Sequence, residues 1–191
     1  MGLRSLLAAR GWPPRAGLGL GLAAALALLA AAPAEGVVVG AQADDRPQLE
    51  LVLDRRGRQL RVLLRGQELR RFPVAVGRPG WETPVGEFQV LELVEDPVWE
   101  HPATGERVPP GPSNPLGSRW IGFHHDCQGR SGFNGREHLV VEGCVSSGFH
   151  GTPNRGSVGQ AVSHGCVRLL DEHVRDLFEL VELGTPVTVL P

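Results

Sequence analysis

The sequence predicts a mostly β domain, either a β-sandwich or an open barrel, with one α-helix packed near its C-terminal end. Short runs of alternating apolar and polar residues recur along the chain, and turn residues separate them. The 26 glycines and 16 prolines favour turns over long helices. Apart from the N-terminal apolar run, helical periodicity occurs in one segment only. A length of 191 residues fits one domain with a substantial core.

The first 34 residues are predicted to be a signal peptide, and residues 35–47 a flexible lead-in. Three arginines precede an unbroken apolar run over Ala16–Ala32, and the A-x-A cleavage pattern ends at Ala34. The alternative is an uncleaved membrane anchor, because the apolar run approaches the length that spans a bilayer. Cleavage would remove three arginines and no acidic residue, taking the formal charge from −2 to −5. We expect export to the periplasm or cell envelope.

Three short strands joined by turns are expected to open the domain as a β-meander, because apolar residues alternate with polar ones there. These strands are residues 49–53, 60–64 and 69–76. Further strands are expected at residues 87–94, 120–123, 139–141 and 187–189. The proline-rich and glycine-rich residues 96–118 are expected to form a long surface loop.

One segment has the periodicity of an amphipathic helix. Its apolar residues recur at spacings of three and four and form one stripe, made of Val174, Leu177, Phe178 and Val181. We predict Asp171 as the N-cap of this helix and Gly184 as its C-terminal stop.

Composition excludes several kinds of chemistry. The chain has no lysine and no tyrosine, so lysine Schiff bases, P-loop lysines and tyrosine nucleophiles are impossible. The formal charge of −2, without a basic stripe, makes nucleic acid an unsuitable partner. We expect a monomer.

The three cysteines divide into a pair and a single thiol. In an oxidising compartment thiols tend to pair, and an odd one is reactive or intermolecular. Cys127 and Cys144 bracket one glycine-rich segment, whereas Cys166 stands in a different context. The simplest partition is a Cys127–Cys144 disulfide and a free Cys166.

The stretch from Phe149 to Arg168 contains the parts of an acyl-transfer site. Gly165 lets the backbone approach a substrate, and amide N–H groups around Cys166 can form an anion-binding nest. Such positive surroundings predict a lowered pKa for the Cys166 thiol. An imidazole beside the thiol can take its proton and return it to a leaving amine. Taken alone, Cys166 is equally well interpreted as a small buried apolar residue.

The same stretch closely resembles the signature of the L,D-transpeptidase (YkuD-type) catalytic domain, which is a His-Gly, a variable segment and then Ser/Thr-His-Gly-Cys. Four other segments are similar to further landmarks of that family, in the expected order. They are residues 73–77, 83–88, 114–117 and 184–187. The resemblance covers residues 48–190 and implies a YkuD-like β fold for a catalytic domain at 48–191.

The resemblance implies a role for each matching residue. Cys166 would be the nucleophile, His150 the general base and later the general acid, and the Gly151 carbonyl would orient the imidazole. The amides of His164, Gly165 and Cys166 would form the oxyanion hole. Ser163 and His164 would shape the cleft. Arg168 would hold a substrate carboxylate, although some family members carry Asn there and a structural salt bridge is an equal alternative.

Residues 124–148 depart from the family pattern as an inserted loop. A Cys127–Cys144 bridge would close about seventeen residues and contribute about 3 kcal/mol, and the closed loop would lie beside the cleft as a lid. The neighbouring His124, His125 and Asp126 lack the spacing of a zinc site, so we expect no metal. Surface roles are expected for the remaining histidines, His101, His138 and His173.

The resemblance implies a reaction without a cofactor. Cys166 would form a thioester with a peptidoglycan tetrapeptide stem and release the terminal D-alanine. An amine of a second stem would then form a 3→3 cross-link, and carbapenem β-lactams are expected to acylate the same cysteine. The alternatives are a cell-wall L,D-carboxypeptidase or endopeptidase, and an inactive peptidoglycan-binding module.

Overall fold

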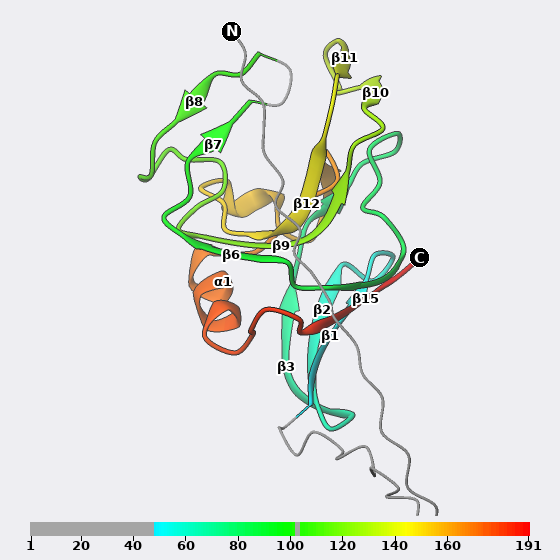
Figure 1. Cartoon of the computed structure of the whole chain (residues 1–191), viewed down its shortest axis with the longest axis vertical. Helices are drawn as coiled ribbons and strands as arrows, with labels where there is room; N and C mark the ends of the chain where they lie inside the picture. The colour runs from blue at the N-terminus through cyan, green and yellow to red at the C-terminus, as the bar shows by residue number, and fades with distance from the viewer. Residues whose placement is uncertain (1–47, 102–103) are drawn as a thin grey trace, which may run out of the picture. The chain divides into compact units, whose positions relative to one another are not determined.

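The protein is described by a computed structural model that covers residues 48–101 and 104–191 (Figure 1). The predicted signal peptide and lead-in lie outside these described residues. Within them, no helix is both long and apolar enough to cross a lipid bilayer. The described chain is mostly strands with a single α-helix, which confirms the predicted fold class, and its sheets do not close into a barrel.

The larger sheet has five strands in the order β3-β2-β1-β15-β5. Strands β1 (Leu49–Asp54), β2 (Gln59–Leu64) and β3 (Gln67–Pro73) form the predicted antiparallel meander. The last strand of the chain, β15 (Pro186–Leu190), runs parallel to β1 and antiparallel to β5 (Gly86–Gln89). The two ends of the domain therefore share one sheet, which closes the fold through long-range backbone pairing.

The second sheet, of four strands, carries the functional stretch. Its order is β14-β12-β9-β6. β6 (Glu92–Glu95) and β12 (Val145–His150) both run antiparallel to β9 (Arg119–Asp126), and β14 (Val167–Arg168) runs parallel to β12. The sequence did not predict β12, because its serines and glycine break the apolar alternation.

Both principal sheets contribute to one hydrophobic core. Side chains of the meander and of β15 meet side chains from β9, β12, β14 and the helix, among them Leu51, Leu53, Ile121, Phe149, Val167 and Leu177. All six are essentially inaccessible to solvent. Residues alternate between the two faces of a strand, so burial of Ile121, Phe149 and Val167 turns their neighbours to the opposite face of the sheet.

The predicted insertion is not an irregular loop. β9 and β12 extend into it, and between them lies a β-hairpin of β10 (Arg130–Phe133) and β11 (His138–Val141) (Figure 1). The predicted Cys127–Cys144 disulfide is present and closes the base of this hairpin. Backbone pairing and a covalent bond together give the segment a defined shape.

The helix α1 (Asp171–Phe178) is shorter than its apolar stripe, and both predicted ends were wrong. Leu170, which has no polar side-chain atom, occupies the N-cap, and the Asp171 carboxylate binds Ser118 instead of capping the helix. The helix ends at Phe178, and Gly184, with a φ of +88°, belongs to the turn before β15. Tertiary contacts at both ends override the local helix signals.

Short elements complete the domain, and two of them interrupt the predicted surface loop. β7 (Trp99–Glu100) pairs with β8 (Arg107–Val108), while β4 (Val76–Gly77) pairs with β13 (Ala161–Ser163). A 3-10 turn, η1 (Arg155–Ser157), follows β12. The buried amide of Asn114 donates to the carbonyls of Pro97, Val108 and Pro109, which organises the 96–118 segment from within.

The shared core makes a simple stability prediction. Leu53→Ala removes a fully buried side chain of the central meander, which we expect to lower the free energy of unfolding by about 2–5 kcal/mol. Leu183→Ala is the matched control, because Leu183 is 65% exposed and surface changes stay within about 0.5 kcal/mol. Urea unfolding of both variants measures this, and equal losses would contradict the assigned core.

Candidate active site

Cys166 lies at the end of a tight turn that its own neighbours stabilise. The Ser163 hydroxyl donates to the Cys166 carbonyl at 2.5 Å and accepts from the Gly165 amide at 3.2 Å. Gly165 has a φ of +114°, a conformation that L side chains rarely adopt. Ser163 is buried, so its hydroxyl orders the turn from within. The Gly165 amide is also occupied, which leaves the amides of His164 and Cys166 as the predicted oxyanion donors.

The pairing of β12 with β14 brings the two halves of the motif together. The register matches Phe149 with Val167 and His150 with Arg168. Phe149 and Val167 face the core, so His150, Arg168 and Cys166 share the opposite face. Cys166 therefore stands diagonally across from His150 on this face.

The Cys166 thiol is free and sits over the backbone of β12. Its Sγ donates to the Ser146 carbonyl at 3.7 Å. Burial among protein atoms raises the pKa of this thiol, and the Gly148 amide and the charges of Arg168 and Arg130 offset that only in part. The sequence-based prediction of a lowered pKa was wrong, because loss of hydration outweighs the positive surroundings. The resting thiol is protonated at neutral pH.

The His150 imidazole is held in one orientation and kept neutral. Nδ1 donates to the Gly151 carbonyl at 2.5 Å, and the ring stacks on Trp120 with centroids 6.0 Å apart. With the proton on Nδ1, the lone pair is on Nε2. Burial lowers the pKa of His150 to about 4, and the nearby charge of Arg168 adds to this. The imidazole is therefore ready to accept a proton at neutral pH.

No hydrogen bond joins Sγ to the imidazole in the described part of the chain; the thiol points to Ser146 instead. A thiol moves between partners by rotation about one bond, and catalytic hydrogen bonds commonly tighten only when substrate is bound. The resting site is thus a neutral thiol beside a neutral imidazole. Such a pair can transfer one proton as the sulfur attacks a carbonyl.

Three arginines lie around the turn of Cys166: Arg130 and Arg168 act on the thiol, and Arg78 acts on the His164 imidazole. Arg78 donates Nε to the Val162 carbonyl at 3.1 Å and Nη1 to the Asn134 carbonyl. Arg130 donates Nη2 to the Glu82 carbonyl at 2.9 Å. For the Arg168 guanidinium, neither an ion pair nor a hydrogen bond is found among residues 48–101 and 104–191, so the structural salt bridge that was its alternative role has no support. Sequence reasoning missed Arg78 and Arg130, because each lies far from the motif.

His164 packs beside the turn as an edge-on partner of Trp81, with ring centroids 5.1 Å apart. Burial lowers the pKa of His164, and the charge of Arg78 adds to this. Its Nε2 and the Trp81 Nε1 are buried without a hydrogen-bond partner in the described chain. Trp81 was not among the site residues predicted from the sequence. The one sequence signal near it is the Arg78–Gly80 turn, which ends the meander.

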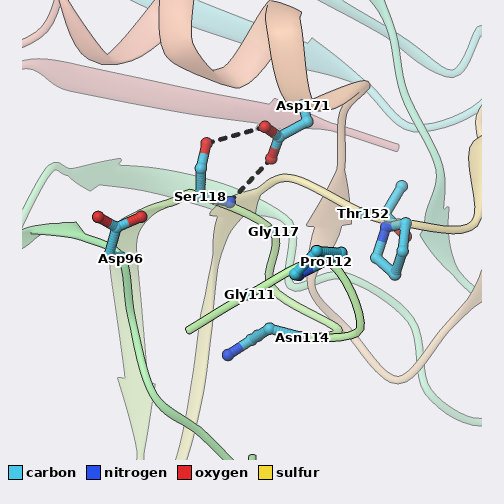
Figure 2. A pocket seen from close by; sticks show the side chains of 9 residues that line it. Asp96, Gly111, Pro112, Asn114, Gly117, Ser118, Thr152 and Asp171 are labelled. Atoms are coloured by element: carbon cyan, nitrogen blue, oxygen red, sulfur yellow. Dashed lines mark hydrogen bonds between the residues drawn. The ribbon is translucent and has the colours of Figure 1, made fainter. Parts of the chain in front are cut away.

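A cavity of about 310 Å³ lies between the start of α1 and the loop before β9 (Figure 2). Thr152, Pro153 and Asp171 are among its lining residues, whereas Cys166 and His150 are not. Figure 2 shows the Asp171 carboxylate bound to the amide and hydroxyl of Ser118, at 2.8 and 2.9 Å. We assign this cavity a structural role, because its polar contacts join the start of α1 to the loop before β9.

One histidine of the inserted segment, His125, lies near the disulfide. One of its ring nitrogens and the sulfurs of Cys127 and Cys144 lie within 4.8 Å of one another. Sulfurs bonded to each other offer no thiolate to a metal. The His125 Nδ1 is instead 2.8 Å from the Ser146 hydroxyl.

The chain matches the family model of the L,D-transpeptidase catalytic domain over residues 49–189. This stretch includes both halves of the Cys-His site and both principal sheets. The chain therefore belongs to the L,D-transpeptidase family. YqjB of Bacillus subtilis (strain 168), whose name assigns it to the L,D-transpeptidases, is 34% identical over 140 residues, covering 73% of this chain and 69% of that protein. YkuD of Bacillus licheniformis, named in the same way, is 27% identical over 155 residues, which cover 81% of this chain and 73% of that protein.

Solved structures agree in fold. An L,D-transpeptidase from Mycobacterium smegmatis aligns with a TM-score of 0.52 and 25% identity, over 76% of this chain. The structure of LdtMt1 in complex with imipenem aligns with a TM-score of 0.53 and 21% identity, over 75% of this chain. The alignments span 59% of each of those two chains, so they concern the domain alone.

The raised pKa of the Cys166 thiol has a measurable consequence. Iodoacetamide reacts with the thiolate, so we expect the alkylation rate of Cys166 to keep rising through pH 9. Mass spectrometry of the folded protein at a series of pH values gives this rate. A rate that levels off below pH 7 would mean a preformed thiolate and would contradict the assignment.

Buried His150 also links stability to pH. Its pKa is about 4 in the folded protein and 6.5 when unperturbed, so the unfolded chain binds the extra proton between these values. Stability is then highest above pH 6.5 and falls by about 3 kcal/mol as the pH drops to 4. Urea unfolding at pH 7 and pH 4 should show a larger loss for the wild type than for His150→Gln. An equal loss would mean that His150 is not buried as a neutral group.

Proposed function

We propose that this domain is a cysteine acyltransferase that acts on peptidoglycan tetrapeptide stems through a thioester on Cys166 and forms 3→3 cross-links. The observation that carries the proposal is the shared face of Cys166 and His150, created by the β12–β14 register in a domain of this family. The substrate class comes from the family.

The reaction starts from neutral groups. As Sγ attacks the carbonyl of the donor peptide, its proton passes to Nε2 of His150, because Nδ1 is already bound to Gly151. Forming a buried thiolate without a partner would cost free energy, so we expect the thiol to lose its proton to His150 as Sγ attacks the carbonyl. The imidazolium then returns the proton to the leaving amine, and the thioester remains on Cys166.

Charge that develops on the carbonyl oxygen needs donors already in position. The amides of His164 and Cys166 flank Gly165, whose positive φ shapes the turn, and we assign them to the oxyanion hole. Ser163 supports this arrangement from behind by binding the backbone on both sides of the turn. We expect Ser163→Ala to lower the acylation rate through loss of this order.

Arg168 is suited to hold a carboxylate of the departing residue. It pairs with His150 in the strand register, and its guanidinium has no ion pair among the described residues. The leaving amine must lie near the imidazole that protonates it, so a carboxylate on the same residue would come within reach of Arg168.

Export fits the same function. The apolar N-terminal run ends in an A-x-A pattern, and a disulfide at the base of the hairpin is typical of an oxidising compartment. Periplasmic or cell-envelope localisation would give the enzyme access to peptidoglycan.

The decisive functional test uses a β-lactam and a stem peptide. After treatment with imipenem, intact-mass analysis should detect one covalent adduct, which peptide mapping assigns to Cys166. Cys166→Ala should form none, and His150→Ala should react at least about 10²–10⁴-fold more slowly. The control is His138→Ala, an exposed histidine on β11. An adduct on another residue, or a normal rate for His150→Ala, would refute the assignment.

The same enzyme with a disaccharide-tetrapeptide separates the rival functions. Cross-linked dimers support transpeptidation, whereas tripeptide release alone would identify a carboxypeptidase. If neither product forms and Cys166 is unreactive, the domain is an inactive wall-binding module.

A further inference from the structure

The hairpin of the inserted segment carries a third arginine up to the nucleophile. A Cβ added to Gly165 would lie 3.0 Å from Nη1 of Arg130, so this guanidinium rests against the residue before Cys166. Its side chain is 25% exposed, which leaves one edge open to a ligand.

The position of Arg130 is fixed by contacts on several sides. Its guanidinium lies over the Trp81 ring, 5.3 Å from the centroid, and Nη2 donates to the Glu82 carbonyl at 2.9 Å. Gly132 on the same strand approaches the Trp81 indole so closely that a Cβ there would lie 2.8 Å from Nε1. The disulfide at the base of the hairpin limits how far this whole unit can swing.

The positive charge of Arg130 is not neutralised by these contacts. The nearest carboxylate oxygen, on Glu82, is 4.0 Å away on a side chain that is 48% exposed, a geometry that contributes little. Nη1 of Arg130 makes no hydrogen bond to any residue in the described ranges. Arg78 differs, because Nε, Nη1 and Nη2 all donate to backbone carbonyls and thereby brace the hairpin tip to β13.

Arg130 and Arg168 come to the site from different elements, the inserted hairpin and β14. Arg168 pairs with His150, on the side where the leaving amine is protonated. Arg130 lies against Gly165, the residue before Cys166. The charges of both arginines act on Cys166 and His164. With the departing residue of the donor peptide by Arg168, Arg130 is the second guanidinium beside Cys166 that can meet the retained acyl part.

We propose that Arg130 is a specificity-determining residue that binds a carboxylate on the retained acyl part of the donor peptide. The proposal rests on the proposed function and names the chemistry that the inserted hairpin adds to it. A guanidinium held by stacking and one backbone bond, with a free N–H edge, is preorganised for a carboxylate. Donors that carry carboxamides in place of these carboxylates should be acylated less efficiently.

The test compares two donor tetrapeptides that differ only in the retained part, with free carboxylates in one and carboxamides in the other. Both keep the same terminal D-alanine, and its release gives kcat/KM. We expect the wild type to prefer the carboxylate donor by at least about tenfold. Arg130→Met should reduce this preference to within about twofold by slowing only the carboxylate donor, and Arg130→Lys should keep part of it.

The control is Arg136→Ala, an exposed arginine in the turn of the same hairpin, which should leave the preference unchanged. Non-reduced peptide mapping verifies the disulfide in each variant. If Arg130→Met slows both donors equally, Arg130 is a structural brace and the proposal is wrong. It is equally wrong if the wild type turns over both donors alike. Release of D-alanine from neither donor by the wild type would instead refute the proposed function.

Discussion

The pairing of β12 with β14 is the constraint on which the site depends. Only the two residues of β14 set the register, and backbone hydrogen bonds hold this segment to β12 on one side and to Ala75 on the other. The Leu169 amide donates to the His150 carbonyl at 2.8 Å, while Arg168 exchanges backbone bonds of 2.9 and 3.0 Å with Ala75. Core burial of Phe149 and Val167 then decides which face Cys166 and His150 share. A slip of one residue would turn the thiol into the core.

Burial explains why this site works with neutral groups. The same enclosure that lowers the pKa of His150 raises that of Cys166, so neither is ionised at rest near neutral pH. Positive charges around Cys166 do not create a thiolate, and they are free to bind anionic substrate groups instead. In the proposed function, Arg130 and Arg168 are therefore substrate contacts and not activators of the nucleophile.

Local sequence signals predicted the meander, the free thiol and the disulfide, and the family resemblance supplied the pairing of His150 with Cys166. They failed where distant contacts decide. Asp171 was predicted as a helix cap, but Ser118, far away in sequence, binds its carboxylate. The inserted segment forms a hairpin because β9 and β12, which pair with each other, extend into it. Arg130 reaches the site only through that hairpin, so no spacing rule could have found it.

The pH dependence of Cys166 acylation tests the central claim most directly. Stopped-flow measurement with imipenem from pH 3 to pH 9 should give a rate that rises with a midpoint near the His150 pKa of about 4 and then stays level to pH 8. That profile requires a neutral imidazole that takes the thiol proton during attack. A rate that instead climbs tenfold per pH unit from pH 6 to pH 9 would follow free thiolate, and it would contradict the coupling of His150 to Cys166.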